Sequence, residues 1–252
     1  MTTDSWSYSP ILHPARSSQA LKGFMTHPPS EIQAVVFDLD GLMFNTEDIF
    51  NEVGHTVLRR RGRELTSELL SLMMGRRAPE AMQACIDYHR LHDDTVEGLI
   101  HETRVLFEEL ATDRLEPMPG LHRLLDEIER SGLPKGVATS SGRRYLEGML
   151  GRFELLDRFH LTLAAEDVTH GKPHPEIYLT AAQRLQIEPG QMLVLEDSHA
   201  GTSAAVAAGA FAVSVPSRHT RHLDYSHAHL VVERLDDPRV LHHVRRHAAD
   251  RS

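Results

Sequence analysis

The sequence predicts an α/β protein with a doubly wound, mostly parallel sheet and an inserted α-helical block. Two observations predict the sheet: short apolar runs alternate with helical patterns, and several of these runs end in acidic or hydroxyl-bearing residues. A third observation predicts the insertion, because residues 47–115 show helical periodicity without an intervening strand. Such a stretch is far longer than an ordinary crossover connection, so we expect it to form a helical subdomain of its own.

The first predicted strand covers residues 33–38 and leads into two aspartates. Asp38 and Asp40 are separated by one residue, and Gly41 after them signals a turn. Alternate side chains of a strand point to the same side, so we expect the two carboxylates to lie together where the strand ends. Two carboxylates held close repel each other, which drives their pKa values apart. Such a pair of carboxylates is expected at a site that binds a divalent cation or an incoming phosphate.

The remaining elements follow from the same periodicities. Inside the block, helical patterns cover 47–61, 66–74, 79–91 and 93–111. Residues 116–120 carry two prolines and a glycine and mark the return to the core. Beyond them, helices are expected at 121–131, 143–150, 175–185 and 201–208, and short strands at 136–139, 160–163, 192–197, 211–215 and 230–232. Strands that alternate with helices imply right-handed βαβ units, whose ligands bind at the carboxyl ends of the strands.

The two ends of the chain lie outside this pattern. Residues 1–31 lack periodicity and the features of a secretory signal, so we expect a flexible extension, within which Met25 is an alternative start. Residues 32–46 and 116–235 are assigned to the sheet-bearing core, and 236–252 to a C-terminal tail. His219, His222, His227 and His229 have spacings that metal sites use, but their polar surroundings favour a solvated loop.

Composition excludes several classes of function. The net charge is −9 and no basic stripe is present, so no nucleic-acid partner is expected. No apolar stretch approaches the ~20 residues that cross a bilayer, so no membrane association is expected. Cys85 is the single cysteine, which fits a reducing cytoplasm, and its expected role is that of a small buried apolar residue. A monomer is the simplest oligomeric state.

Four separated segments are expected to converge on one edge of the sheet. They carry, in chain order, Asp38 and Asp40, then Thr139, Ser140 and Ser141, then Lys172, and finally Glu196 and Asp197. Hydroxyl and amide groups can bind phosphoryl oxygens, and a lysine fixed between a glycine and a proline offers a positive charge. Carboxylates from two strand ends supply the oxygen ligands that Mg²⁺ prefers. Together these segments predict a site for phosphoryl transfer.

These motifs resemble those of the haloacid-dehalogenase-like superfamily, in the branch of helical-cap phosphatases and β-phosphoglucomutases. The resemblance rests on Asp38-Leu39-Asp40-Gly41, on residues 137–141, on Gly171-Lys172-Pro173-His174-Pro175 and on residues 195–201, and it covers about 33–235. It implies a Rossmann-like core with a helical cap at 47–115. It also implies an Mg²⁺-dependent phosphatase that acts on a small phosphorylated metabolite, with a sugar phosphate as the expected substrate.

The resemblance implies a role for each catalytic residue. Asp38 would attack phosphorus and form an aspartyl-phosphate, and Asp40 would act as general acid and then as general base. Thr139 and Lys172 would hold the transferring phosphoryl group, and Lys172 would also neutralise Asp38. Splitting hydrolysis through a carboxylate intermediate is ordinary nucleophilic catalysis. One acid of the opening pair must then keep a proton that the other lacks.

The resemblance also implies the metal and substrate sites. The expected Mg²⁺ ligands are Asp38, Asp40 through its carbonyl oxygen, Glu196 and Asp197. The expected substrate-binding residues are Ser140 and Ser141 beside the phosphate, and Arg76 and Arg77 in the cap. We expect one of the two arginines to bind a second anionic group of the substrate.

Two departures from the family pattern bear on the alternatives. Asn45-Thr46 stands where many relatives have an aspartate before Ser or Thr, close to the hinge expected at 44–47 and 116–120. The block contains no lysine, and Ala78 stands where the arginine of a hexose-phosphate mutase is expected, which disfavours a β-phosphoglucomutase. A phospho-accepting receiver domain is the alternative from another class, but it lacks the inserted block and an acid equivalent to Asp40.

Overall fold

The sheet has six parallel strands with the first strand of the chain near its centre, in the order β3-β2-β1-β4-β5-β6. The structure is a computed structural model that describes residues 31–249, so most of the extension expected at 1–31 lies outside the described residues. The strands are β1 (Ala34–Phe37), β2 (Lys135–Ala138), β3 (Leu161–Leu163), β4 (Met192–Glu196), β5 (Phe211–Ser214) and β6 (Leu230–Val231). The α/β fold class and the parallel sheet predicted from the sequence are confirmed.

The register of β1 aligns the ends of three strands. Phe37 pairs with Val137 of β2 on one side and with Leu195 of β4 on the other. Because the strands are parallel, the residues that follow these three positions emerge at the same edge. This edge lies where the chain order reverses on either side of β1, which is where ligands bind in open α/β sheets.

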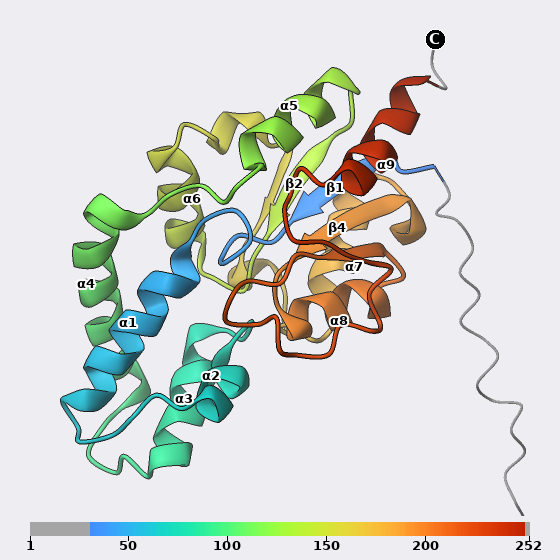
Figure 1. Ribbon diagram of the computed structural model, residues 1–252. Helices are drawn as coiled ribbons and strands as arrows, with labels where there is room; N and C mark the ends of the chain where they lie inside the picture. Colours follow the sequence, from blue (N-terminus) through green and yellow to red (C-terminus); the bar gives the residue numbers. More distant parts are fainter. Residues whose placement is uncertain (1–30, 250–252) are drawn as a thin grey trace, which may run out of the picture.

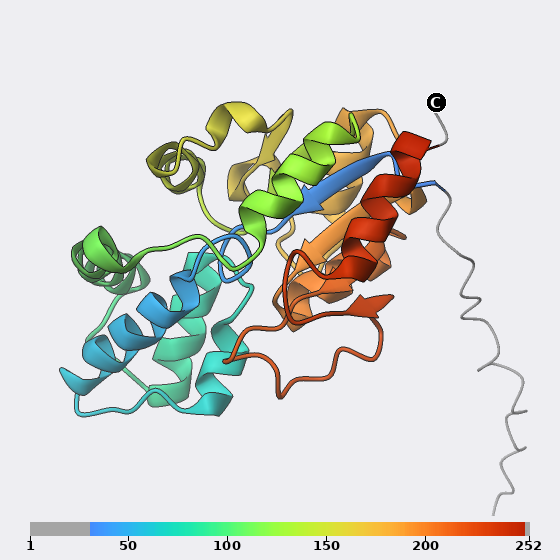
Figure 2. The same cartoon turned by 45° about the horizontal axis from the view of Figure 1, so that its top comes forward.

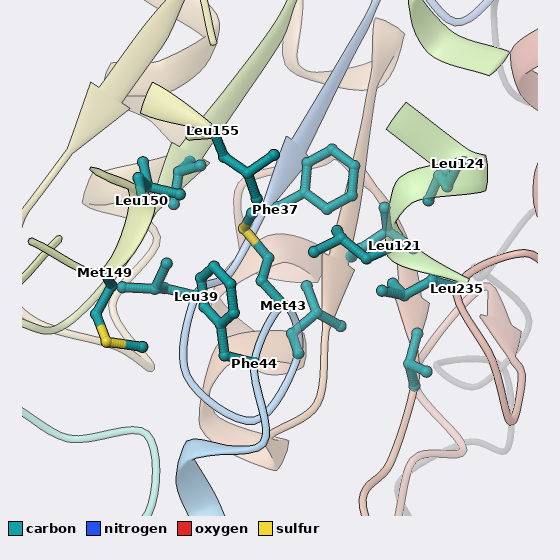
Figure 3. Packing of buried hydrophobic residues seen from close by; sticks show 14 of the residues in the cluster. Phe37, Leu39, Met43, Phe44, Leu121, Leu124, Met149, Leu150, Leu155 and Leu235 are labelled. Atoms are coloured by element: carbon teal, nitrogen blue, oxygen red, sulfur yellow. The ribbon is translucent and has the colours of Figure 1, made fainter. Parts of the chain in front are cut away.

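Helices cover both faces of the sheet (Figures 1 and 2). They are α5 (Leu121–Arg130), α6 (Arg143–Arg152) and α9 (Pro238–Ala249) on one face and α7 (Glu176–Leu185) and α8 (His199–Ala207) on the other, with single turns at Leu156–Arg158, Ala165–Asp167 and Pro189–Gln191. Side chains alternate along β1, so Phe37 packs with α5, α6 and α9, as Figure 3 shows in part, while Val36 packs with α7 and α8. Both faces of β1 are therefore buried.

The C-terminal helix α9 belongs to the packed helical layer, unlike the separate tail expected at 236–252. Val240 and Val244 are one helical turn apart and fully buried, and α9 packs against α5. The guanidinium of Arg245 also lies 2.7 Å from a carboxylate oxygen of Glu127 in α5. The many charged residues of this segment conceal an apolar stripe, which is why composition alone suggested a tail.

The inserted block contains four helices that pack on one another beside the carboxyl edge of the sheet (Figure 1). They are α1 (Thr46–Arg59), α2 (Ser67–Met73), α3 (Ala78–His89) and α4 (Val96–Arg114). Helix α4 begins later than the pattern from 93 indicated, because the Thr95 hydroxyl accepts from the Gly98 N–H at 3.1 Å and fixes the start. Within residues 31–249, no helix combines the length and the apolarity needed to span a membrane.

Three histidines of the loop between β5 and β6 make specific contacts, which differs from the solvated loop expected there. His219 Nε2 lies 2.8 Å from an Asp48 carboxylate oxygen of α1, and His229 Nδ1 accepts from the Ala212 N–H at 3.1 Å. His227 Nε2 lies 3.1 Å from the Ser203 hydroxyl. In the described part of the chain these histidines do not gather into a cluster that could hold a metal ion. Their contacts instead hold the loop against the core and against α1.

The two segments that join the block to the core lie side by side. The Asn45 amide donates to the Arg114 carbonyl at 3.0 Å and accepts from the Glu116 N–H at 2.8 Å. The Met118 N–H donates to the Met43 carbonyl at 2.8 Å. The Asn45 side chain is thus used to connect the two crossings rather than to cap α1.

Replacing Asn45 by alanine should loosen this connection. Loss of two hydrogen bonds at an exposed position is expected to lower the free energy of unfolding by about 1–2 kcal/mol and to speed hydrogen exchange at the Glu116 amide. Thermal unfolding and exchange mass spectrometry measure both effects. Asn45→Asp is the matched control, because it keeps the acceptor but loses the donor and should fall between wild type and Asn45→Ala. Unchanged exchange in Asn45→Ala would contradict this role.

Candidate active site

A buried lysine connects acids from two strand ends. Asp38 directly follows β1 and Glu196 is the last residue of β4. The ammonium of Lys172 contacts an Asp38 carboxylate oxygen, lies 2.6 Å from Glu196 Oε1, and donates to the Ala138 carbonyl at 3.1 Å. Lys172 is 3% exposed. The structure therefore brings together the first, third and fourth segments that the sequence placed at this edge.

The charges of this group are linked. Burial acts to lower the pKa of Lys172, but the carboxylates of Asp38 and Glu196 raise it well above its usual range. Burial raises the pKa of Asp38 to about 8, against the opposing effect of Lys172. Buried Asp197 follows Glu196, so three buried acids gather beside an ammonium that contacts two of them. Further positive charge here would hold Asp38 in the ionised form that a nucleophile needs.

The geometry of the acids fits a divalent cation. Oxygens of Asp38, Glu196 and Asp197 all lie within 4.8 Å of one another. Asp197 Oδ2 is buried and has no hydrogen-bond partner, and burial followed by the charge of Glu47 raises the pKa of Asp197 well above its usual range. A Cβ atom at Gly41 would lie 2.4 Å from that oxygen and 2.7 Å from Glu47 Cγ, so only a glycine lets these two acids approach the turn after β1. An unpaired buried carboxylate oxygen within this group of acids fits the oxygen donors that a divalent cation takes.

Glu196 has a different environment from Asp197. Its Oε1 accepts from Lys172 and from the Tyr178 hydroxyl at 2.5 Å, and its Oε2 accepts from the Ser198 hydroxyl at 3.1 Å. Both oxygens of Glu196 are therefore already hydrogen-bonded. These contacts hold Lys172 in place, and the role of Glu196 as a metal ligand stays a prediction, since its carboxylate also belongs to the group of acids that could hold a cation. Tyr178 was not predicted, because its position on α7 carries no motif.

The carboxyl group of Asp40 is held apart from this charged group. Ser141 donates to Asp40 Oδ2 at 2.7 Å, and Tyr145 donates to Oδ1 at 2.8 Å. Thr139 lies at 3.5 Å from Oδ2 and accepts from the Ser141 N–H at 3.0 Å. Burial raises the pKa of Asp40, while the hydrogen bonds from Ser141 and Tyr145 oppose the rise. Asp38 and Asp40 thus differ in their partners, as acid–base chemistry requires.

Tyr145 and Glu47 are site residues that the sequence reasoning missed. Tyr145 lies in the first turn of α6 and Ser141 just before that helix, and both hydroxyl groups reach the same acid. Glu47 lies in the first turn of α1, where an acid is ordinarily explained by the helix dipole. Its carboxylate contacts the Ser217 hydroxyl and faces Asp197. The N-terminus of the block is therefore part of the site.

The two arginines expected to bind substrate have different surroundings. Arg77 donates to the carbonyls of Ala165, Val168 and Thr169 at 3.1, 2.6 and 3.0 Å. These contacts fasten the loop before α3 to the core. Arg76 is exposed and lines the cavity. Of the pair, Arg76 is the one placed to meet a substrate.

Ser140 also connects the two parts of the molecule. Its hydroxyl donates to the Gly75 carbonyl at 3.0 Å, so a residue expected beside the phosphate contacts the block. A cavity of about 380 Å³ begins at Asp38 and Asp40 and continues between the helices of the block. Its size lies in the range of pockets that enclose small ligands.

Comparisons with known proteins identify a family and relatives of this chain. The family model described as haloacid dehalogenase-like hydrolase matches residues 35–215. (DL)-glycerol-3-phosphatase 1, mitochondrial, from Arabidopsis thaliana is 32% identical over 206 residues, which are 79% of this chain and 66% of that longer protein. Validoxylamine A 7'-phosphate phosphatase from Streptomyces hygroscopicus subsp. limoneus is 34% identical over 194 residues, covering 74% of this chain and 87% of that protein.

A solved structure supports the fold alone. β-Phosphoglucomutase from Clostridium difficile superposes with a TM-score of 0.71 at 21% identity, over 87% of this chain and 98% of that chain.

Removing the Tyr145 hydroxyl should shift the titration of Asp40. The hydroxyl stabilises the ionised carboxylate, so Tyr145→Phe raises the pKa of Asp40 further. Asp40 then keeps its proton to higher pH. Because the leaving alcohol needs that proton, the alkaline limb of the pH profile of kcat/KM for an alkyl phosphate moves to higher pH. The pH profile measures the shift, with Tyr88→Phe in α3 as the control. An alkaline limb at the wild-type pH would contradict an effect of the Tyr145 hydroxyl on the pKa of Asp40.

Proposed function

Because the chain belongs to the haloacid dehalogenase-like hydrolase family, we propose that it is an Mg²⁺-dependent phosphatase that works through an aspartyl-phosphate on Asp38. The chain is a phosphoric monoester hydrolase, as the phosphatases similar to it indicate. One observation carries the mechanism: a buried lysine contacts Asp38 while a separate set of hydroxyl groups holds Asp40. The two acids are thereby fitted for different tasks.

The first half-reaction transfers the phosphoryl group to the enzyme. A carboxylate oxygen of Asp38 attacks phosphorus, the bond from phosphorus to the leaving oxygen breaks, and Asp40 gives its proton to that oxygen. Thr139 and Lys172 hold the phosphoryl oxygens through the hydroxyl and ammonium groups that face Asp40 and Asp38. Catalysis of this kind depends mainly on positioning and charge neutralisation.

The second half-reaction releases phosphate. Asp40, now ionised, accepts a proton from water; the water oxygen attacks phosphorus and the bond to Asp38 breaks. Glu196 keeps Lys172 in position through both steps. Mg²⁺, when bound, neutralises the phosphate and the acids; Asp38, Asp197 and the carbonyl of Asp40 would hold it, with Glu196 beside them.

We propose that the helical block, residues 47–115, is the cap that closes the site. Ser140 and Arg77 tie the loop before α3 to the core, and the cavity runs beneath this loop. The side-by-side crossings at Met43–Asn45 and 116–118 supply a hinge for opening. A closing cap excludes water from the first half-reaction. A small phosphorylated metabolite fits the space, and the sugar phosphate expected from the sequence stays a prediction.

Replacing the nucleophile tests the mechanism. Asp38→Asn keeps the shape but removes the attacking charge, so phosphate release should fall by ~10⁴-fold or more. Activity is measured on sugar phosphates, phosphoglycolate and nucleotides, with and without Mg²⁺, and the phosphoenzyme is trapped by acid quench. Asp113→Asn, at an exposed position of α4, is the matched control. Activity that survives Asp38→Asn or needs no divalent cation would overturn the mechanism. Conversion of β-glucose 1-phosphate to glucose 6-phosphate would instead support a mutase.

The two arginines should respond differently to replacement. Arg77→Ala removes three hydrogen bonds to the core, so it should change kcat for all substrates alike and speed hydrogen exchange in residues 165–171. Arg76→Ala should raise KM only for substrates with a second anionic group, by roughly 10-fold. Steady-state kinetics on one-anion and two-anion esters separates the effects. Identical profiles for both variants would refute this division.

A further inference from the structure

The cavity is apolar along most of its length. From the catalytic acids it continues between α1, α2, α3 and α4, where its walls include Leu58, Leu65, Leu70, Cys85, Leu99 and Ile100. Cys85 and Leu99 are 3% and 1% exposed, so this part lies inside the block rather than on its surface. We call it the apolar chamber, defined by these six residues.

Asn51 of α1 and Thr103 of α4 are half-buried polar side chains on the cavity wall, and the hydroxyl groups nearer the acids already have partners. Ser141 already donates to Asp40, Ser140 to the Gly75 carbonyl and Ser198 to Glu196. The cationic side chains that line the cavity, Arg76 and Arg104, are exposed. A sugar pushed into the chamber would bury hydroxyl groups without partners, which is unfavourable.

An empty space of this size needs an explanation. Protein interiors are packed so densely that voids much larger than one water molecule are few, and an unfilled apolar cavity lowers stability. Cavities lined by apolar side chains stay dry and bind apolar molecules. The chamber opens directly to Asp38 and Asp40, so a molecule inside it is connected to the reacting phosphate.

We propose that the substrate is a phosphate monoester of an amphiphilic alcohol, whose apolar group fills the chamber while its phosphate lies at the acids. The proposal rests on the proposed phosphatase function and narrows its substrate class. Each methylene group that enters the chamber leaves water and gains binding free energy, which corresponds to about a fourfold gain in affinity. The alcohol released would then leave through the opening of the cap.

A chain-length series tests the proposal. With the full chain and saturating Mg²⁺, kcat/KM for straight-chain alkyl phosphates, kept below micelle-forming concentrations, should rise about fourfold per methylene until the chamber is full. The longer esters should exceed glucose 6-phosphate. A flat series, or a preference for glucose 6-phosphate, would overturn the proposal while leaving phosphatase activity established.

Binding of alkyl phosphonates, measured by calorimetry, separates the two levels of the argument. These compounds resist hydrolysis, so affinity that rises with chain length supports the chamber even if no ester is hydrolysed, in which case the proposed function fails alone. Affinity independent of chain length overturns the chamber. Each outcome therefore decides one claim without depending on the other.

Variants locate the bound chain. Cys85→Phe and Ile100→Phe place a ring in the chamber, so the gain in kcat/KM with chain length should stop at shorter chains than in the wild type. Leu72→Phe, on the exposed side of α2, is the matched control and should follow wild type. Two chamber variants are used so that misfolding of one, seen by circular dichroism, leaves the other. If both folded variants keep the wild-type dependence of kcat/KM on alkyl length, the alkyl group binds elsewhere and the proposal is wrong.

Discussion

The contact of the Lys172 ammonium with Asp38 and Glu196 is the interaction on which the rest of the site depends. Buried carboxylates repel one another and lose hydration, so they persist only with compensating positive charge. The sheet supplies the geometry, because parallel strands end together and bring Asp38 and Glu196 to one edge. The loop that carries Lys172 then supplies the charge. Without it, the burial that makes the site reactive would destabilise the fold.

Compensation at this edge is incomplete, and that is functionally informative. Asp197 keeps an oxygen without a hydrogen-bond partner, and Gly41 lets that oxygen lie close to the turn after β1. Asp40 escapes the same problem by accepting from Ser141 and Tyr145. Two solutions to carboxylate burial therefore occur at the same edge of the sheet. The free oxygen of Asp197 can accept a cation. Asp40 is instead held by the neutral hydroxyl donors of Ser141 and Tyr145.

The strand-end residues could be predicted because an apolar run that ends in acids or hydroxyl-bearing residues can be recognised from the local sequence alone. The parallel sheet follows from the same pattern, whereas the order of its strands was not predicted. Partners from other helices could not be predicted: Tyr178 on Glu196 and the carbonyl contacts of Arg77 depend on tertiary packing that no local period encodes. The packing of α9 could not be predicted for a related reason: its apolar stripe is buried only because α5 lies beside it. The chamber likewise exists only once four helices meet.

The closeness of the two crossings has a consequence for how such proteins diversify. The chain leaves the core at Asn45 and returns at Glu116, and the backbone N–H of the first donates to the carbonyl of the second at 3.1 Å. The inserted block therefore leaves and re-enters the core at one place, and side chains such as Arg77 add contacts with the core elsewhere. Its interior can be rebuilt, lengthened or exchanged without moving the sheet or the acids at its edge. One catalytic core can in this way act on many leaving groups, because the inserted block alone changes the substrate specificity.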